Sequence, residues 1–321
     1  MSERPILEVR DLRTTYQVRR LGRKLRLQAV DGVSLSLGEG EVLGIVGESG
    51  CGKTTVGRSI IRLTPAESGS VVFKGIDVLA ARDARLRELR LKIRMVFQDP
   101  YASLNPRRSI GDSVAEAGDI NGAFPSDGDR TKRIAETLTS VGLDPAFAQR
   151  YPHELSGGQR QRVGIARAIL PVPDIIIADE PVSALDVSVQ AQVLNLMMDL
   201  QEQLKLSMLF ISHDLSVIGQ ISDRVAVMYM GRVMELASAR VILDHPVHPY
   251  TRALMDAIPK PDPSRRITGA IELGEPPSQF DRPAGCVYAP RCPLASSRCA
   301  TEVPQLRDIA QYDRMVACHN V

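Results

Sequence analysis

The sequence predicts an α/β fold with a largely parallel sheet, interrupted by a helical insertion and followed by a loop-rich extension. Short apolar runs rich in β-branched residues alternate with stretches of helical periodicity, a pattern typical of layered α/β proteins. The runs occupy residues 42–46, 93–97, 174–178, 207–211 and 224–230. Between two of these runs, apolar side chains recur at helical spacing, namely Val189, Val193, Leu196, Leu200 and Leu204. Buried strands separated by helices are therefore expected.

Two segments depart from this alternation. Between about residues 100 and 165 the strand signals stop, and Ile134, Leu138 and Val141 mark an amphipathic helix, so this stretch is expected to be a helical insertion. After about residue 237, prolines and cysteines accumulate and strand signals become few, which indicates a separate extension. The predicted division is a domain at 1–236 and an extension at 237–321.

Length, composition and charge narrow the class of protein. The chain has 321 residues, 44% of them apolar, which suits one large domain with an appendage. Its 40 basic residues against 38 acidic ones give no reason to expect nucleic-acid binding. The start, MSERPILEV, lacks the apolar core of a signal peptide, and no apolar run approaches the roughly 20 residues that span a bilayer. A soluble cytoplasmic protein is expected, held by other subunits if it works at a membrane.

A glycine-rich loop follows the first apolar run. Residues 47–54 read Gly-Glu-Ser-Gly-Cys-Gly-Lys-Thr, a complete Walker A pattern in which glycines let backbone N–H groups face phosphate oxygens. Lys53 is expected to reach the β- and γ-phosphates and Thr54 to ligate Mg²⁺, while Cys51 is interpreted as a small residue and not as a nucleophile. The predicted ATP contacts of this segment are Gly47, Ser49, Gly50, Cys51, Gly52, Lys53, Thr54 and Thr55.

Two carboxylates end the third apolar run. Asp179 and Glu180 follow Ile175-Ile176-Ile177-Ala178, at the strand end where α/β folds bind ligands. On its own this pattern is weak, because an acid that caps a helix would look the same. Together with Walker A it predicts that Asp179 coordinates Mg²⁺ through water and that Glu180 is the general base for the attacking water.

A second pair of glycines precedes a helical stretch. Residues 155–159 read Leu-Ser-Gly-Gly-Gln, and glycines at a helix start make sense where backbone N–H groups must approach a phosphate. Here the sequence resembles the ABC ATPases, whose signature motif is LSGGQ. The resemblance implies that two such domains pair head to tail, so that Ser156, Gly157, Gly158 and Gln159 contact the ATP held by the partner's Walker A loop.

The resemblance to ABC ATPases covers the first 240 residues. It implies a P-loop core with a RecA-like parallel sheet and an antiparallel β subdomain. Gln98 resembles the Q-loop glutamine, a Mg²⁺ contact that also senses the transmembrane partner. Ser183 and Asp186 lie in a D-loop-like segment, and His213 resembles the switch histidine at the γ-phosphate. Tyr16 resembles the aromatic that stacks on adenine, although a basic stretch at 19–26 lengthens its spacing to Lys53, and an edge-strand tyrosine is the alternative.

Three further features resemble the F-type ATPase subunits of oligopeptide and dipeptide importers. They are residues 97–106 (FQDPYASLNP), residues 248–251 (HPYT) and the cysteine-bearing tail. The resemblance implies ATP- and Mg²⁺-dependent peptide import by a peripheral subunit on the cytoplasmic face of the membrane. Its implied partners are a paralogous ATPase subunit, two transmembrane permease subunits and an extracytoplasmic substrate-binding protein, with no nucleic acid.

Two alternative functions stay open at this point. The cargo of the same kind of importer could be nickel, glutathione or another small solute, because the ATPase subunit does not touch the cargo. A soluble ABC ATPase outside transport is the other alternative, although such proteins usually carry two fused cassettes or a long coiled coil, and this sequence has neither.

Four cysteines lie in the last 36 residues, at Cys286, Cys292, Cys299 and Cys318. Four thiolates suit Zn²⁺ or an iron–sulfur cluster. The spacings of five, six and eighteen residues lack the short knuckle that zinc sites usually show. The resemblance to the importer ATPases favours a [4Fe–4S] cluster, with Zn²⁺ and the absence of any metal as the alternatives.

Overall fold

The computed structural model describes residues 4–20, 23–257, 277–280, 282–309 and 314–321, which fall into two compact units. The first unit contains residues 4–6, 37–42 and 80–211, and the second contains the others. In the part of the chain that is described, no helix is both long enough and apolar enough to cross a membrane.

The first unit is built on three parallel strands in the order β8-β7-β6. These are β6 (Ile93–Val96), β7 (Ile175–Asp179) and β8 (Ser207–Ser212). Ile177 pairs with Met95 on one side and with Leu209 on the other. Every residue of β7 and β8 is buried, as expected for parallel strands covered on both faces. The prediction of an α/β fold from the apolar runs is confirmed.

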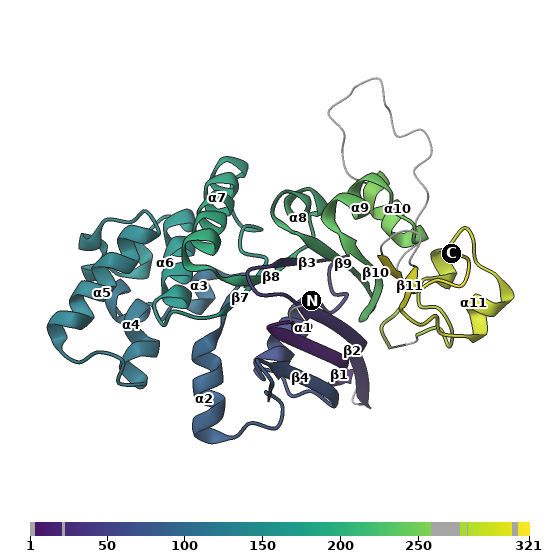
Figure 1. Ribbon diagram of the computed structural model, residues 1–321, viewed down its shortest axis with the longest axis horizontal. Helices are drawn as coiled ribbons and strands as arrows, with labels where there is room; N and C mark the ends of the chain where they lie inside the picture. The colour runs from purple at the N-terminus through teal and green to yellow at the C-terminus, as the bar shows by residue number, and fades with distance from the viewer. Residues whose placement is uncertain (1–3, 21–22, 258–276, 281, 310–313) are drawn as a thin grey trace. The chain divides into compact units, whose positions relative to one another are not determined.

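Helices make up the rest of the first unit. They are α2 (Asp83–Lys92), α3 (Pro100–Ser103), α4 (Ile110–Ile120), α5 (Asp127–Ser140), α6 (Gly157–Ile169) and α7 (Val187–Leu204), with two 3₁₀ turns at Pro145–Gln149 and Pro152–Glu154. Figure 1 shows α4, α5 and α6 side by side. Residues 100–165, all described, contain helices and no strand, which agrees with the helical insertion expected there.

Helices α5 and α7 form where the apolar periodicity predicts them. Ser126 caps α5 by accepting a hydrogen bond from the Asp129 N–H, and Ile134 and Leu138 are buried on its inner face. Helix α7 buries Val193 and Leu200 as expected.

The second unit holds two sheets. The first has the order β2-β1-β4-β5, with β1 (Leu7–Arg20), β2 (Arg23–Leu37), β4 (Ser68–Phe73) and β5 (Ile76–Asp77). The second runs β11-β12-β10-β9-β3, with β3 (Val42–Val46), β9 (Arg224–Tyr229), β10 (Arg232–Ser238), β11 (Arg307–Ile309) and β12 (Arg314–Val316). Strands β9 and β10 form a hairpin whose two turn residues, Met230 and Gly231, both have positive φ angles of 43° and 78°.

Helices flank these sheets in the second unit. They are α1 (Lys53–Ile60), α8 (Leu215–Ile221), α9 (Ala239–Asp244), α10 (Pro249–Asp256) and α11 (Ser297–Thr301), with a 3₁₀ turn at Ala289–Arg291. Helices α9 and α10 pack against β10 (Figure 1), and α1 packs against β1.

The extension after residue 237 shares a sheet with the residues before it. Strand β12 pairs antiparallel with β10, so that Glu235 lies opposite Val316, and β11 continues the sheet. This pairing could not be predicted from the sequence, because β11 and β12 are three-residue strands that begin with arginine and contain no apolar run. The predicted boundary between 236 and 237 lies inside β10; the division into those two domains is untested and stays a prediction.

A buried ion pair joins β10 to β12. Arg314 Nη1 donates to Glu235 Oε1 at 2.8 Å, and the two side chains are 3% and 0% exposed. Arg314 also donates to the His245 carbonyl, and Glu235 Oε2 accepts the His248 N–H at 3.0 Å. The carboxylate thus holds β10, β12 and the start of α10 together.

We expect Arg314→Met to lower the free energy of unfolding by about 3–5 kcal/mol, because removing one partner leaves a buried charge uncompensated. Arg298→Met is the matched control, since Arg298 pairs with Glu302 on the surface, with side chains 62% and 56% exposed, and such pairs contribute about 1 kcal/mol or less. Denaturant unfolding of the full chain measures both. Equal losses in the two variants would contradict the role assigned to the buried pair.

Candidate functional site

The Walker A loop connects β3 to α1 in the second unit, and the fold leaves no room for side chains at its two ends. A Cβ atom on Gly47 would lie 2.1 Å from the Met228 carbonyl oxygen. A Cβ atom on Gly52 would lie 2.2 Å from the Ala29 carbonyl oxygen, and Gly52 has a φ angle of 105°, which side chains disfavour. Glycine is therefore required at both positions by packing, and at Gly52 also by backbone conformation.

Lys53 is buried within the curve of this loop. Its Nζ atom donates hydrogen bonds to the carbonyl oxygens of Gly47 at 2.8 Å and Glu48 at 3.1 Å. Ser49 and Gly50 are exposed, whereas Thr54 and Thr55 are half-buried in the first turn of α1. Burial raises the pKa of the Cys51 thiol, which keeps the thiol protonated and agrees with the interpretation of Cys51 as a small residue.

Tyr16 lies on β1 close to this helix. Its hydroxyl oxygen is 3.4 Å from Oγ1 of both Thr55 and Thr64. Tyr16 is therefore near the first turn of α1, where a nucleotide-binding role and a purely structural one are both compatible with its contacts.

The acidic residues lie in the first unit. Asp179 is fully buried at the end of β7. Glu180, which follows it, has a positive φ angle of 44°, and its N–H donates to the Ile211 carbonyl at 2.9 Å. Gln98 Nε2 donates to Glu180 Oε2 at 2.9 Å. The chain thus brings Gln98 and Glu180 together.

The signature motif and the D-loop meet at one cavity of the first unit. Ser156 caps α6 by accepting the Gln159 N–H at 3.3 Å, while Gln159 Oε1 accepts the Ser156 N–H at 2.9 Å, forming a capping box. The cavity has a volume of about 290 Å³. Its described lining includes Ser156, Gly157, Gly158, Gln159 and Asp186. Ser183 lies upstream, where its hydroxyl donates to the Glu180 carbonyl at 3.1 Å.

His213 is exposed directly after β8. Its neighbour Asp214 caps α8 by accepting the Ser216 N–H at 2.8 Å. The predicted residues thus form local groups: the Walker A loop with Tyr16, Gln98 with Glu180, and the signature motif with Asp186.

The prediction of a metal-binding cysteine cluster is wrong. Among the residues that the structure describes, no three His, Cys, Asp or Glu side chains come together in a group that could hold a metal ion. The described residues therefore support neither the [4Fe–4S] cluster that the resemblance favoured nor its Zn²⁺ alternative.

The tail cysteines instead take part in local hydrogen bonds. Cys318 Sγ accepts the Asn320 N–H at 3.4 Å, and Cys299 Sγ lies 3.4 Å from the Ser296 hydroxyl. The backbone N–H of Cys286 donates to the Cys299 carbonyl at 2.8 Å. The Cys286–Cys299 hydrogen bond joins two segments of the extension, and the other two contacts are local.

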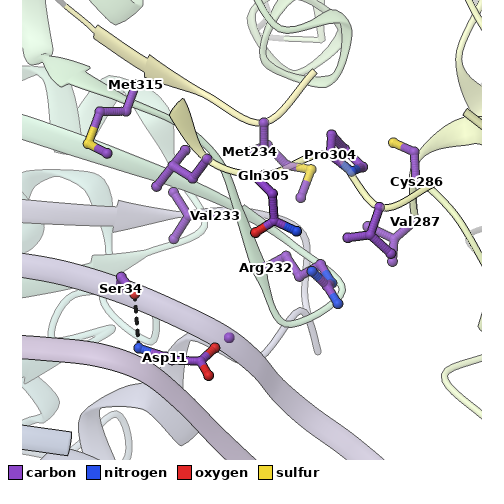
Figure 2. Close-up of a pocket in the computed structure, with 14 residues that line it drawn as sticks. Asp11, Ser34, Arg232, Val233, Met234, Cys286, Val287, Pro304, Gln305 and Met315 are labelled. Carbon is purple, nitrogen blue, oxygen red and sulfur yellow. Dashed lines mark hydrogen bonds between the residues drawn. The ribbon is translucent and has the colours of Figure 1, made fainter. Parts of the chain in front are cut away.

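A further cavity of about 320 Å³ lies in the second unit, between β1, β2, β10 and the extension. Figure 2 shows Asp11 and Ser34 on one side and Cys286, Val287 and Pro304 on the other. Among the predicted site residues, Cys286 is the one found in its described lining. This cavity is therefore separate from the residues expected to bind ATP.

Two protein families match the sequence. The family described as "ABC transporter" matches residues 30–183, and the family described as "Oligopeptide/dipeptide transporter, C-terminal region" matches residues 234–299. The first match contains the Walker A loop, the acidic pair Asp179–Glu180 and the signature motif, and the second contains three of the four tail cysteines.

Several known proteins are similar in sequence to the chain along nearly its whole length. A putative peptide import ATP-binding protein of Brucella ovis is 50% identical over 309 residues, covering 96% of each chain. The oligopeptide transport ATP-binding protein AppF of Bacillus subtilis is 49% identical over 324 residues, covering 99% of this chain and 98% of AppF. Among solved structures, the dimeric ATP-binding cassette MJ0796 bound to ADP and Pi has a TM-score of 0.65 at 30% identity, covering 73% of this chain and 99% of its own.

We expect Gly52→Ala to abolish nucleotide binding and to lower the free energy of unfolding by about 1–3 kcal/mol, because the left-handed conformation is strained for alanine. Gly164→Ala is the control, since Gly164 lies within α6 and an added Cβ atom would meet no neighbouring element within 4 Å. Alanine there should stabilise the helix by about 0.5–1 kcal/mol. Calorimetric ATP titration and denaturant unfolding give both quantities. Normal ATP binding by Gly52→Ala would contradict the packing argument.

Proposed function

The chain belongs to the family of ABC transporter ATPases that serve oligopeptide and dipeptide transporters, and we propose that its ATP hydrolysis powers peptide import across the cytoplasmic membrane. The observation that carries this proposal is the extent of the similarity. Identity of 49–50% to peptide and oligopeptide transport proteins covers 96–99% of the chain. It includes both the ABC region and the C-terminal region of the oligopeptide/dipeptide transporter family.

The phosphate end of ATP is assigned to the Walker A loop. Lys53 neutralises the β- and γ-phosphates, and the backbone N–H groups of the loop donate to phosphate oxygens, as the dipole of α1 favours an anion at its first turn. The exposed backbone at Ser49 and Gly50 supports this assignment, because a ligand can reach it. Tyr16, near Thr55, is assigned to the adenine ring.

The metal and the attacking water are assigned to four side chains. Mg²⁺, when bound, neutralises charge on the phosphates, and the oxygen donors of Thr54, Gln98 and Asp179 are of the type it prefers. Glu180 accepts the proton of the attacking water, and the hydrogen bond from Gln98 to its carboxylate supports this role because it orients the base. His213 is assigned to the γ-phosphate.

The signature motif is assigned to a partner's nucleotide. MJ0796, which this chain resembles, forms a dimer bound to ADP and Pi. The cavity lined by Ser156, Gly157, Gly158 and Asp186 supports an equivalent role here, because its glycines leave backbone N–H groups accessible at the start of α6. The partner proposed is a paralogous ATPase subunit.

The assembly proposed around this pair is a membrane transporter. Two permease subunits hold the ATPases at the cytoplasmic face, and a substrate-binding protein delivers peptide from the other side. Closure of the ATPase pair on ATP would move the permeases, and hydrolysis would reset them.

We expect Glu180→Gln to bind ATP with unchanged affinity and to hydrolyse it about 10²–10⁴-fold more slowly, because the amide oxygen can still accept the Gln98 hydrogen bond but cannot take a proton. The measurement is phosphate release under saturating ATP in a complex whose partner site is also disabled.

The matched control is Glu202→Gln, an equal chemical change on the exposed surface of α7, which should leave turnover unaltered. Near-normal hydrolysis by Glu180→Gln, with ATP binding intact, would show that Glu180 is not the base.

A further inference from the structure

The side chain of Glu48, the second residue of the Walker A loop, extends from the loop to the C-terminal extension. Arg291 Nη1 donates to both carboxylate oxygens of Glu48, at 2.9 and 3.0 Å. The Arg291 side chain is 6% exposed and that of Glu48 is 28% exposed. Solvent therefore screens this ion pair much less than a surface pair, and charge-assisted hydrogen bonds of this length are among the stronger ones in proteins.

An aromatic cluster fixes Arg291. Its Nη1 atom also donates to the Tyr229 hydroxyl at 3.1 Å, and its guanidinium lies 5.6 Å from the centre of the Tyr229 ring. Tyr229 contacts Tyr250 and Tyr288 with ring centres 4.6 and 5.3 Å apart. Because all three tyrosines are about 1% exposed, Arg291 has little freedom to leave Glu48.

Tyr250 contacts the backbone of the loop directly. Its hydroxyl oxygen accepts the Glu48 N–H at 3.0 Å. Burial raises the pKa of Tyr250, so the hydroxyl stays neutral at physiological pH. Glu48 is consequently held by two residues of the extension, through its side chain and through its peptide group.

The extension contacts the loop directly at one further point and indirectly, through the β9–β10 turn, at another. Gln279 Nε2 donates to the Gly50 carbonyl at 2.6 Å. Arg282 donates to the Met230 carbonyl in the β9–β10 turn, and the next residue, Gly231, donates its N–H to the Cys51 carbonyl at 2.7 Å.

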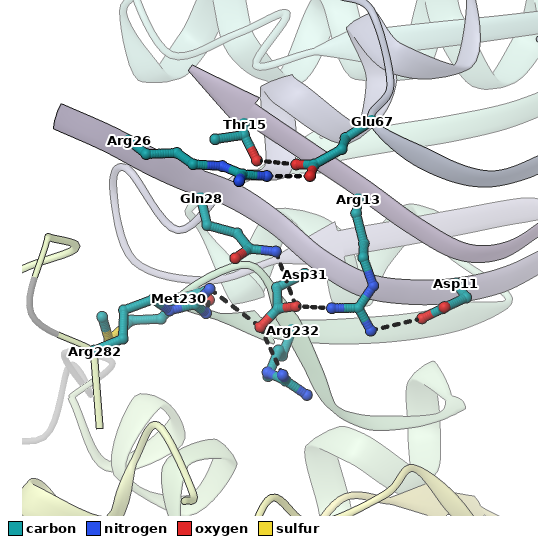
Figure 3. A network of polar contacts seen from close by, with 10 residues as sticks. All are labelled: Asp11, Arg13, Thr15, Arg26, Gln28, Asp31, Glu67, Met230, Arg232 and Arg282. Atoms are coloured by element: carbon teal, nitrogen blue, oxygen red, sulfur yellow. Dashed lines mark hydrogen bonds and ion pairs between the residues drawn. The ribbon is translucent and has the colours of Figure 1, made fainter. Parts of the chain in front are cut away.

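Asp31 in turn holds the hairpin residues Met230 and Gly231 between β9 and β10. Figure 3 shows Asp31 between Arg13, Arg232 and Arg282, with Arg282 Nη1 at 3.2 Å from Asp31 Oδ2. The Asp31 N–H donates to the Gly231 carbonyl at 2.8 Å. The turn that contacts Cys51 is therefore anchored to β2 and to the extension together.

We propose that Arg291 and Tyr250 are positioning residues, through which the C-terminal extension holds the Walker A loop in the conformation that receives ATP phosphates. The proposal rests on the proposed role of this loop in ATP binding. A loop that is already ordered loses less entropy when it binds, whereas a loop that is ordered only part of the time binds with an affinity reduced by that fraction. The extension then sets the affinity for ATP without touching it.

The first test is Arg291→Met in the full chain. It should weaken ATP binding about 10-fold or more, because it removes hydrogen bonds to a charged group, and it should raise KM for ATP more than it lowers kcat. Fluorescent-nucleotide titration and steady-state hydrolysis by the assembled transporter give these values. Arg298→Met, which removes the exposed Arg298–Glu302 pair of the same extension, should change neither.

Two further variants separate positioning from folding. Tyr250→Phe keeps the ring packing and removes one acceptor, so ATP binding should weaken by a few-fold while the melting temperature changes little. Adding Glu48→Gln to Arg291→Met should recover part of the lost affinity, because the neutral amide does not need a cationic partner.

The outcomes distinguish this inference from the proposed function. If the wild-type chain binds ATP but Arg291→Met and Tyr250→Phe bind it equally well, the positioning role is wrong and the ATPase assignment stands. If these variants have a lower melting temperature but unchanged affinity for ATP, the contacts of Arg291 and Tyr250 with Glu48 serve stability alone and the inference is wrong. If the wild-type chain does not bind ATP, the proposed function itself fails.

Discussion

The backbone conformation of the Walker A loop is the constraint that its neighbouring elements in the second unit must satisfy. The loop encloses the side chain of Lys53, and backbone atoms of neighbouring elements lie against its two terminal glycines. Ala29 and Met228 supply backbone atoms where any side chain at Gly52 or Gly47 would collide. Lys53 closes the curve from within by binding two loop carbonyls. The extension contacts the loop through Glu48, so the loop is held in part by residues more than 200 positions further along the chain.

The motifs typical of the ABC family could be recognised in the sequence because their signals are local. Phosphate binding needs glycines and a lysine within eight consecutive residues, and the acidic pair needs a buried strand immediately before it. The strands β3, β7 and β8 were equally predictable, because parallel strands covered on both faces require continuous apolar runs. These patterns identify the motifs. The roles of individual residues such as Tyr16 and His213 stay predictions.

The remaining features depend on contacts that no local pattern encodes. Glu48 and Arg291 are 243 residues apart, and neither has a neighbour that suggests an ion pair. Strand β12 is too short to show periodicity, and it is held in the sheet by the buried pair of Arg314 with Glu235. The cysteine prediction failed for a related reason. The sequence shows that four thiols are available. Whether they meet at one point or make separate local hydrogen bonds depends on the fold.

ATP hydrolysis by this chain, as proposed above, drives peptides across a membrane. The most direct measurement is uptake of a labelled oligopeptide into vesicles that contain the assembled transporter, with substrate-binding protein on the entry side and ATP with Mg²⁺ on the side of the ATPases. We expect peptide to accumulate in the vesicles with hydrolysable ATP and not with a non-hydrolysable analogue. Vigorous ATP hydrolysis by the same vesicles without peptide uptake, or with uptake of nickel or glutathione in its place, would contradict it.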